Sequence, residues 1–257
     1  MEINQIICGD CIKVMKGLPD KSTDMILCDL PYGTTACKWD TIIPFEPLWE
    51  QYKRIIKDNR AIVLTASQPF TSALVMSNPK WFKYEWIWDK TVGSNLFQAK
   101  IAPLKIHENI LVFGNGKVNY VPMMVKKDKP QKQGMYKSIT NGSDVTNKKE
   151  KQKLVGKIYT HSYPKTILTF KKEQRTTNSL HPTQKPVALF EYLIKTYTNK
   201  RDLVLDNCAG SGTTGVACKN LNRRYVLIEK DEKYCQIARD RINQIPESLF
   251  KEKNEKT

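Results

Sequence analysis

The chain has 257 residues, 42 Lys and Arg against 26 Asp and Glu, and a formal net charge of +16. Hydrophobic residues make up 40% of it, and five Trp and eleven Tyr need burial, which excludes disorder throughout and predicts one sizeable core. No apolar run approaches the roughly 20 residues that cross a bilayer, and no signal peptide is evident, so we expect a cytoplasmic protein.

Apolar runs typical of strands alternate with helical patterns at both ends of the chain. The predicted strands cover residues 3–8, 23–28, 61–65, 84–88, 110–113, 203–206 and 225–229. The predicted helices lie between them, at residues 11–16, 47–57, 69–77, 186–197, 213–221 and 231–243. This alternation indicates a parallel sheet covered by helices, assembled from two halves that are distant in the sequence.

The middle of the chain differs from both ends. Residues 114–178 hold 15 Lys and Arg against 4 Asp and Glu, and little apolar periodicity remains between residues 126 and 157, which predicts a loop-rich stretch. A basic segment of this kind indicates a polyanionic partner. We therefore divide the chain into two halves of one α/β domain, residues 1–113 and 179–245, a basic insert, residues 114–178, and a charged tail, residues 246–257.

The seven cysteines are an odd number, and several lie in apolar segments where a reduced thiol behaves as a small hydrophobe. Cys8 and Cys11 form a C-x-x-C pair, but no second Cys or His pair follows at zinc spacing. The sequence therefore predicts neither disulfides nor a metal site.

The first candidate site is a glycine-rich loop after the strand at residues 203–206. The strand ends in Asp206, and a loop through Gly210 and Gly212 leads into a helix whose free N–H groups can bind a ligand. The next strand ends in Glu229, placed to accept hydrogen bonds from both ribose hydroxyls of a nucleoside cofactor. Gly215 completes a G-x-G-x-x-G spacing, so a nicotinamide-dependent oxidoreductase and a plain strand–turn–helix connection remain alternatives.

The second candidate site is Asp29-Leu30-Pro31-Tyr32-Gly33, at the end of the strand at residues 23–28. Asp29 and the carbonyl of Pro31 can accept the two N–H bonds of an exocyclic amine on a flat base, and Tyr32 can stack on its ring. An ordinary turn after a strand is the alternative interpretation.

Together, these two sites resemble those of the DNA amino-methyltransferases that use S-adenosylmethionine. The family's catalytic motif is (D/N/S)-P-P-(Y/F/W), which residues 29–32 match with Leu30 where Pro is usual. The catalytic motif precedes the cofactor loop by about 177 residues, with the basic insert between them, as in the β class of the family. The resemblance implies a Rossmann-like class I methyltransferase sheet with helices on both faces, built from two sequence halves around a target-recognition insert.

Three further segments resemble motifs of the same family. They are Gly9-Asp10-Cys11, beside the cofactor adenine in the family, residues 107–113, before the recognition region, and residues 181–186, at the start of the cofactor-side helix. The resemblance implies catalytic roles for Asp29, Pro31 and Tyr32. It implies cofactor contacts for Asp10, Cys11, Asp206, Asn207, Gly210, Gly212, Glu229, Thr183 and Lys185.

The implied partners are S-adenosylmethionine and double-stranded DNA, with a homodimer common in the β class and association with the nucleoid expected. Asp at the first motif position resembles the adenine-N6 enzymes, while Ser there usually marks the cytosine-N4 enzymes. The alternatives are a cytosine-N4 enzyme, a methyltransferase acting on RNA, protein glutamine or a small molecule, and a non-catalytic DNA-binding protein on the same fold.

Overall fold

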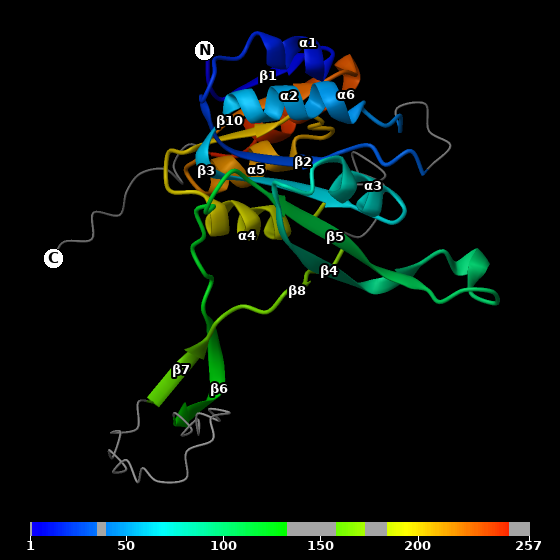
Figure 1. The fold of residues 1–257 in the computed structure, drawn as a ribbon, viewed down its shortest axis with the longest axis vertical. Helices are drawn as coiled ribbons and strands as arrows, with labels where there is room; N and C mark the ends of the chain where they lie inside the picture. Colours follow the sequence, from blue (N-terminus) through cyan, green and yellow to red (C-terminus); the bar gives the residue numbers. More distant parts are fainter. Residues whose placement is uncertain (1, 35–39, 133–157, 173–183, 247–257) are drawn as a thin grey trace, which may run out of the picture. The chain divides into compact units, whose positions relative to one another are not determined.

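The computed structural model describes residues 2–34, 40–132, 158–172 and 184–246. The chain divides into two units, Met1–Val121 with Lys165–Thr257, and Pro122–Pro164. The predicted insert, residues 114–178, contains the whole second unit and extends beyond it on both sides. Figure 1 shows the chain coloured along its sequence.

The first unit is built on one eight-stranded sheet. In sheet order its strands are β1 (Gln5–Cys8), β10 (Arg224–Glu229), β9 (Leu203–Asp206), β2 (Thr23–Asp29), β3 (Ile56–Ala66), β5 (Lys105–Phe113), β4 (Phe82–Ser94) and β8 (Ile167–Thr169). Its helices are α1 (Cys11–Lys16), α2 (Phe45–Ile55), α3 (Phe70–Ser77), the short 3-10 helix η1 (Leu96–Gln98), α4 (Val187–Tyr197), α5 (Thr213–Asn220) and α6 (Glu232–Asn243).

The sheet is mixed, which corrects the prediction of a parallel sheet. The five strands from β1 to β3 are parallel, but β5 runs antiparallel to both β3 and β4. The carboxyl ends of the five parallel strands therefore lie along one edge, where open α/β sheets bind their ligands.

The two sequence halves meet in the middle of the sheet. Ile26 of β2 lies in register with Leu205 of β9, and the buried Asp24 accepts a hydrogen bond from the backbone N–H of Leu203 at 3.0 Å. Asp24 also pairs with Lys57 and Arg60, at 2.8 and 3.2 Å. This pairing places the end of β2 beside the end of β9.

Hydrophobic cores lie on both faces of the sheet because the side chains of each strand alternate. Met25 and Leu27 pack with α4 and α5 on one face, whereas Ile26 and Cys28 pack with α1, α2 and α3 on the other. The helices on both faces agree with the predicted fold class. Figure 1 shows α4 and α5 separated from α1 and α2 by the sheet.

Several elements differ from their predicted bounds. The helix predicted at residues 47–57 ends at Ile55, because the β-branched Ile56 pairs with Thr23 and begins β3. The hairpin of β4 and β5 is much longer than the two predicted strands. The sequence did not indicate the extra length, because the distal half of the hairpin is exposed and its residues show no apolar alternation. β8 lies in the basic insert, residues 114–178, where we predicted no strand or helix.

The second unit contains a two-stranded antiparallel sheet of β6 (Val125–Lys132) and β7 (Ile158–Ser162). The start of the predicted loop-rich stretch is therefore a strand, although its polar sequence gives no apolar alternation. Residues 133–157 lie outside the described part of the chain.

Candidate active site

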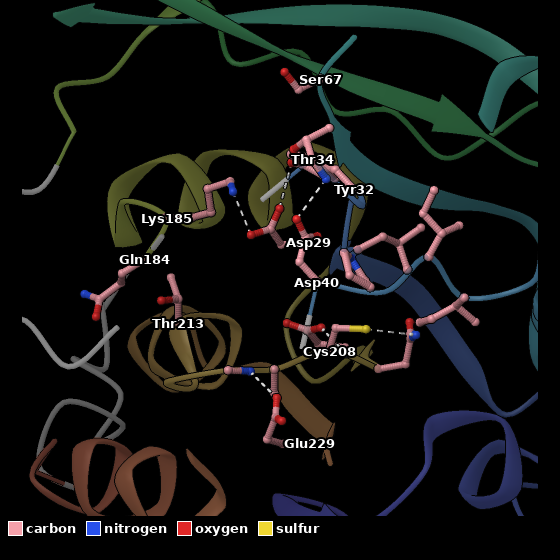
Figure 2. Close-up of a pocket in the computed structure, with 18 of the residues that line it drawn as sticks. Asp29, Tyr32, Thr34, Asp40, Ser67, Gln184, Lys185, Cys208, Thr213 and Glu229 are labelled. Carbon is pink, nitrogen blue, oxygen red and sulfur yellow. Dashed lines mark hydrogen bonds and ion pairs between the residues drawn. The ribbon is translucent and has the colours of Figure 1, made fainter. Parts of the chain in front are cut away.

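A cavity of about 1010 Å³ lies along the carboxyl edge of the sheet. Its lining includes residues that follow β1, β2, β3, β9 and β10, so it contains both candidate sites predicted from the sequence. Figure 2 shows Asp29 and Tyr32 around the same space as Thr213 and Glu229.

Asp29 ends β2 and is held from three sides. Its Oδ1 accepts hydrogen bonds from the Tyr32 hydroxyl at 2.8 Å and from Thr65, which stands opposite it on β3. Its Oδ2 accepts from the ammonium of Lys185 at 2.6 Å. The orientation of this carboxylate in the cavity is thus fixed by hydroxyl and ammonium donors.

Tyr32 is packed as well as hydrogen-bonded. Its ring stacks on Phe70 with 5.4 Å between the centroids, and the Lys185 ammonium lies 5.6 Å from the Tyr32 centroid. Burial and the neighbouring Asp29 charge raise the pKa of the Tyr32 phenol well above its usual value. Tyr32 therefore stays a neutral hydrogen-bond donor at physiological pH.

Lys185 lies between two acidic residues. Its ammonium is 2.6 Å from Asp29 and 3.4 Å from Glu108, and Glu108 also pairs with Lys90 at 3.2 Å. Burial alone would lower the pKa of Lys185, but the carboxylates of Asp29 and Glu108 raise it above its ordinary value. For Glu108, Lys185 and Lys90 outweigh burial, so its pKa is lowered. Lys185 and Glu108 are therefore both charged at neutral pH.

The glycine loop closes on the end of β10. Gly210 and Gly212 have φ values of 51° and 78°, in the left-handed region that glycine adopts without strain. The carboxylate of Glu229 accepts from the N–H groups of Gly210 at 2.8 Å and Asp231 at 2.9 Å. Gly215 is needed for packing, because a Cβ there would lie 2.3 Å from Ile242 Cδ1.

Asp206 and Asn207 are buried and organise the loop. Asp206 accepts from the backbone N–H of Cys208 at 3.0 Å and from the Thr214 hydroxyl, which ties the end of β9 to α5. Burial raises the pKa of Asp206 to about 6, although these hydrogen bonds oppose the shift. The amide oxygen of Asn207 accepts from the Tyr52 hydroxyl at 2.5 Å.

The remaining predicted residues have the following places. Asp10 caps α1 by accepting from the N–H of Lys13 at 3.0 Å, and Asp10, Cys11 and Pro31 all line the cavity. A hydrogen bond from Cys208 lowers the pKa of the Cys11 thiol, against the effect of burial. Lys185, predicted at the cofactor, contacts Asp29 in the structure. Thr183 lies outside the described residues.

Sequence reasoning missed Thr65, Glu108 and Asp40. Thr65 could have been found, because it is a hydroxyl residue near the end of the strand expected beside the catalytic one. Glu108 lies on an antiparallel strand whose partner the sequence does not reveal. Asp40 accepts from the N–H groups of Gly33 and Thr34 at 2.8 and 2.9 Å, which fixes the loop after Tyr32.

The described parts of the chain contain no cluster of three or more His, Cys, Asp or Glu side chains arranged to hold a metal ion. They also contain no helix whose length and apolarity would let it span a membrane.

The fold and the site define an α/β protein of the doubly wound type, with a glycine-rich loop and a fixed acidic group in one cavity. A sequence model of the DNA methylase family, of the N6/N4 methyltransferase type, matches residues 23–240. The chain belongs to this family and is a DNA methyltransferase. This membership sets aside the nicotinamide-dependent oxidoreductase.

Known proteins of the same type cover nearly the whole chain. It is 28% identical over 254 residues to the type II methyltransferase M.HpaI of Haemophilus parainfluenzae, covering 93% of this chain and 74% of M.HpaI. The crystal structure of an M1.HpyAVI–SAM complex matches with a TM-score of 0.61 and 25% identity, over 93% of this chain and 98% of the other. The cytosine-N4-specific PvuII DNA methyltransferase has the same fold, with a TM-score of 0.66 and 14% identity, over 95% and 88%.

Proposed function

We propose that this enzyme methylates the N6 amino group of adenine within a specific sequence of double-stranded DNA. The observation that carries the proposal is the position of the Asp29 carboxylate. It lies in the cavity lined by the glycine loop and Glu229, and donors on three sides hold it. S-adenosylmethionine is the methyl donor, and when bound it supplies an electrophilic methyl group on its sulfonium.

The residues present fit this cofactor. The Glu229 carboxylate at the end of β10 has lone pairs left for ribose hydroxyls beyond those used by two backbone N–H groups. Gly210 and Gly212 lack the side chains that would keep a ligand from the backbone. Asp10 and Cys11 reach the same cavity from the loop after β1. We therefore assign the cofactor to the part of the cavity between these two loops.

Asp29 and Pro31 act on the substrate amine in this proposal. The amine is a poor nucleophile, because its lone pair is delocalised into the base. Hydrogen bonds from the amine to Asp29 and to the Pro31 carbonyl would favour a tetrahedral nitrogen and stabilise its developing positive charge. The cavity would bring the amine close to the methyl group between Asp29 and the glycine loop, and such positioning would provide a large part of the rate enhancement.

Adenine is favoured over cytosine by the resemblance of residues 29–32 to the adenine-N6 motif, in which Asp comes first. Cytosine N4 is the second candidate, because the cytosine-N4-specific PvuII enzyme shares the fold. Both bases carry an exocyclic amine that could donate to the same two acceptors, so the mechanism is the same for either.

The second unit is proposed to bind the DNA. β6 carries Lys126, Lys127 and Lys129, and a two-stranded ribbon has a width that suits the major groove. Lysine contacts to phosphates would supply affinity without sequence preference, and polar side chains of the insert would read the bases. The resemblance also implies a homodimer, and sedimentation of the purified protein would measure its oligomeric state.

The test is to incubate the protein with isotope-labelled S-adenosylmethionine and unmethylated genomic DNA, then to hydrolyse the DNA and identify the labelled nucleoside by mass. Labelled N6-methyladenine is expected. Labelled N4-methylcytosine would keep the mechanism and overturn the base assignment. If the protein binds the cofactor but no labelled nucleoside is found, the proposed reaction is contradicted.

A further inference from the structure

The hairpin of β4 and β5 ends in apolar side chains that no part of the described chain covers. Val92, Leu96, Phe97 and Ile101 are 66%, 70%, 104% and 86% exposed. Phe97 lies on η1, the turn of 3-10 helix at the tip. A cluster of exposed apolar side chains on one projecting element is typical of a surface that contacts a partner.

The topology places this tip on the side of the active site. β5 is antiparallel to β3, so the hairpin turn between β4 and β5 lies at the carboxyl edge of the sheet. Figure 1 shows the hairpin extending beyond that edge. The residues that flank the turn belong to the site, because Ser94, Asn95 and Lys105 line the cavity that contains Asp29.

The charge of the hairpin fits a polyanion. Residues 90–106 contain three Lys and no Asp or Glu. Lys90 pairs with Glu108 and Lys105 contacts Ser67, which leaves Lys100, near Phe97, as the exposed lysine of the tip. An apolar tip with one exposed lysine and no carboxylates would match a surface that presents both stacked bases and phosphates.

We propose that Phe97 inserts into the base stack of DNA and occupies the space that the target base leaves when it enters the cavity. The inference rests on the proposed function, since an amine inside a duplex cannot reach Asp29 unless its base is extruded. Extrusion removes stacking on both sides of the base. An aromatic ring in the gap would restore part of that stacking and stabilise the open duplex.

The experiment compares Phe97→Ala, Phe97→Trp and the unchanged protein on a duplex that the unchanged protein methylates. Met76→Ala is the matched control, because Met76 is a 72% exposed apolar residue on α3, outside the β4–β5 hairpin. Each protein is also given the same target strand opposite an abasic position, where no base pair opposes extrusion. Because Phe97 is fully exposed, thermal unfolding should be the same for all four proteins.

We expect Phe97→Ala to lower kcat/KM on the paired duplex about 10-fold, because the variant loses the stacking of one aromatic ring on the neighbouring bases. The loss should shrink to less than about twofold opposite the abasic position, because pairing no longer holds the base in the duplex. Phe97→Trp should retain the activity on both duplexes, and Met76→Ala should match the unchanged protein.

Other outcomes would overturn the inference. Equal losses on the paired and abasic duplexes would indicate that Phe97 has no part in extrusion. A loss that accompanies dissociation of a dimer in sedimentation would assign the tip to contact between two copies of the chain. An active unchanged protein with an equally active Phe97→Ala would refute this inference alone, whereas an unchanged protein that methylates no DNA would refute the proposed function with it.

Discussion

The ammonium of Lys185 lies 2.6 Å from Oδ2 of Asp29, although 156 positions separate the two residues in the chain. Lys185 is only 7% exposed and also lies 3.4 Å from Glu108. A cation between two carboxylates reduces their repulsion, and its hydrogen bond fixes the orientation of the Asp29 side chain in the cavity. We therefore propose that Lys185 acts through Asp29, as a positioning residue.

Replacing Lys185 tests this role against the cofactor role that the sequence predicts. Lys185→Met leaves two carboxylates without their shared cation and removes one of the donors that fix Asp29, so we expect kcat to fall about 100-fold, the typical effect of losing one preorganised donor. The dissociation constant of S-adenosylmethionine, measured by calorimetry, should change less than about threefold. Lys185→Arg should restore part of kcat, because it keeps the charge.

An unchanged kcat with much weaker cofactor binding would contradict the positioning role and support the cofactor role. Thermal unfolding of each variant separates both results from a general loss of stability.

Asp29→Asn separates methyl transfer from cofactor binding. The amide keeps the shape of the side chain but loses the charge that stabilises the developing cation, so we expect kcat to fall by at least about 100-fold. The cofactor dissociation constant should stay within a few fold, since no cofactor contact is assigned to Asp29. Single-turnover methylation and calorimetry measure the two quantities. A near-normal single-turnover rate for Asp29→Asn would show that Asp29 takes no part in methyl transfer.

Asp206 gives the protein a measurable pH dependence of stability. Its folded pKa of about 6 is above the ordinary 3.8, so the folded state holds the proton more tightly than the unfolded state. Protonation of Asp206 should therefore increase the free energy of unfolding as pH falls through 6, and the increase should be complete below about pH 4. Between pH 7.5 and pH 5 the gain is about 1 kcal/mol.

Urea unfolding of the unchanged protein and of Asp206→Asn at both pH values measures this gain, because other titrating groups are common to the two proteins. The stability difference between them should shift by about 1 kcal/mol in favour of the unchanged protein at pH 5. A difference independent of pH would refute the raised pKa.

Gly215 tests the packing beneath the cofactor loop. A Cβ there would lie 2.3 Å from Ile242 Cδ1 and 2.8 Å from Leu227 Cδ1, so Gly215→Ala should lower the free energy of unfolding by about 1–3 kcal/mol. Gly17→Ala is the control, because the nearest atom to its Cβ is 3.4 Å away, and it should change stability by less than about 0.5 kcal/mol. Ile242→Val in the Gly215→Ala background should restore part of the loss, and additive losses would argue against the predicted clash.

The lysines of β6 should contribute to DNA binding in a salt-dependent way. Replacing Lys126, Lys127 and Lys129 by Ala should weaken binding to all sequences alike and reduce the slope of log K against log salt by up to about 3. Lys200→Ala is the control, since Lys200 precedes β9 at the opposite edge of the sheet from the active site. Fluorescence anisotropy over a salt series measures the slopes, and unchanged slopes would exclude β6 from the interface.

The site was predictable where its residues follow parallel strands. Asp29, Asp206 and Glu229 end strands whose apolar runs are visible in the sequence, and parallel strands bring such ends to one edge. The contact of Lys185 with Asp29 was not predictable, because no pattern in the sequence pairs the residues before α4 with the end of β2. The long β4–β5 hairpin was also missed, since exposed residues carry no alternation.

The first and last elements of the large unit are neighbours. β1 pairs with β10, and Arg239 of α6 donates to the carbonyl of Ile6 at 3.2 Å. A gene that began at α4 and joined α6 to β1 by a short peptide would encode the same sheet with the cofactor loop first and the catalytic motif second. The order of the two motifs along a gene therefore depends only on the point in the fold at which the chain starts. The proposed chemistry depends instead on β2 lying beside β9.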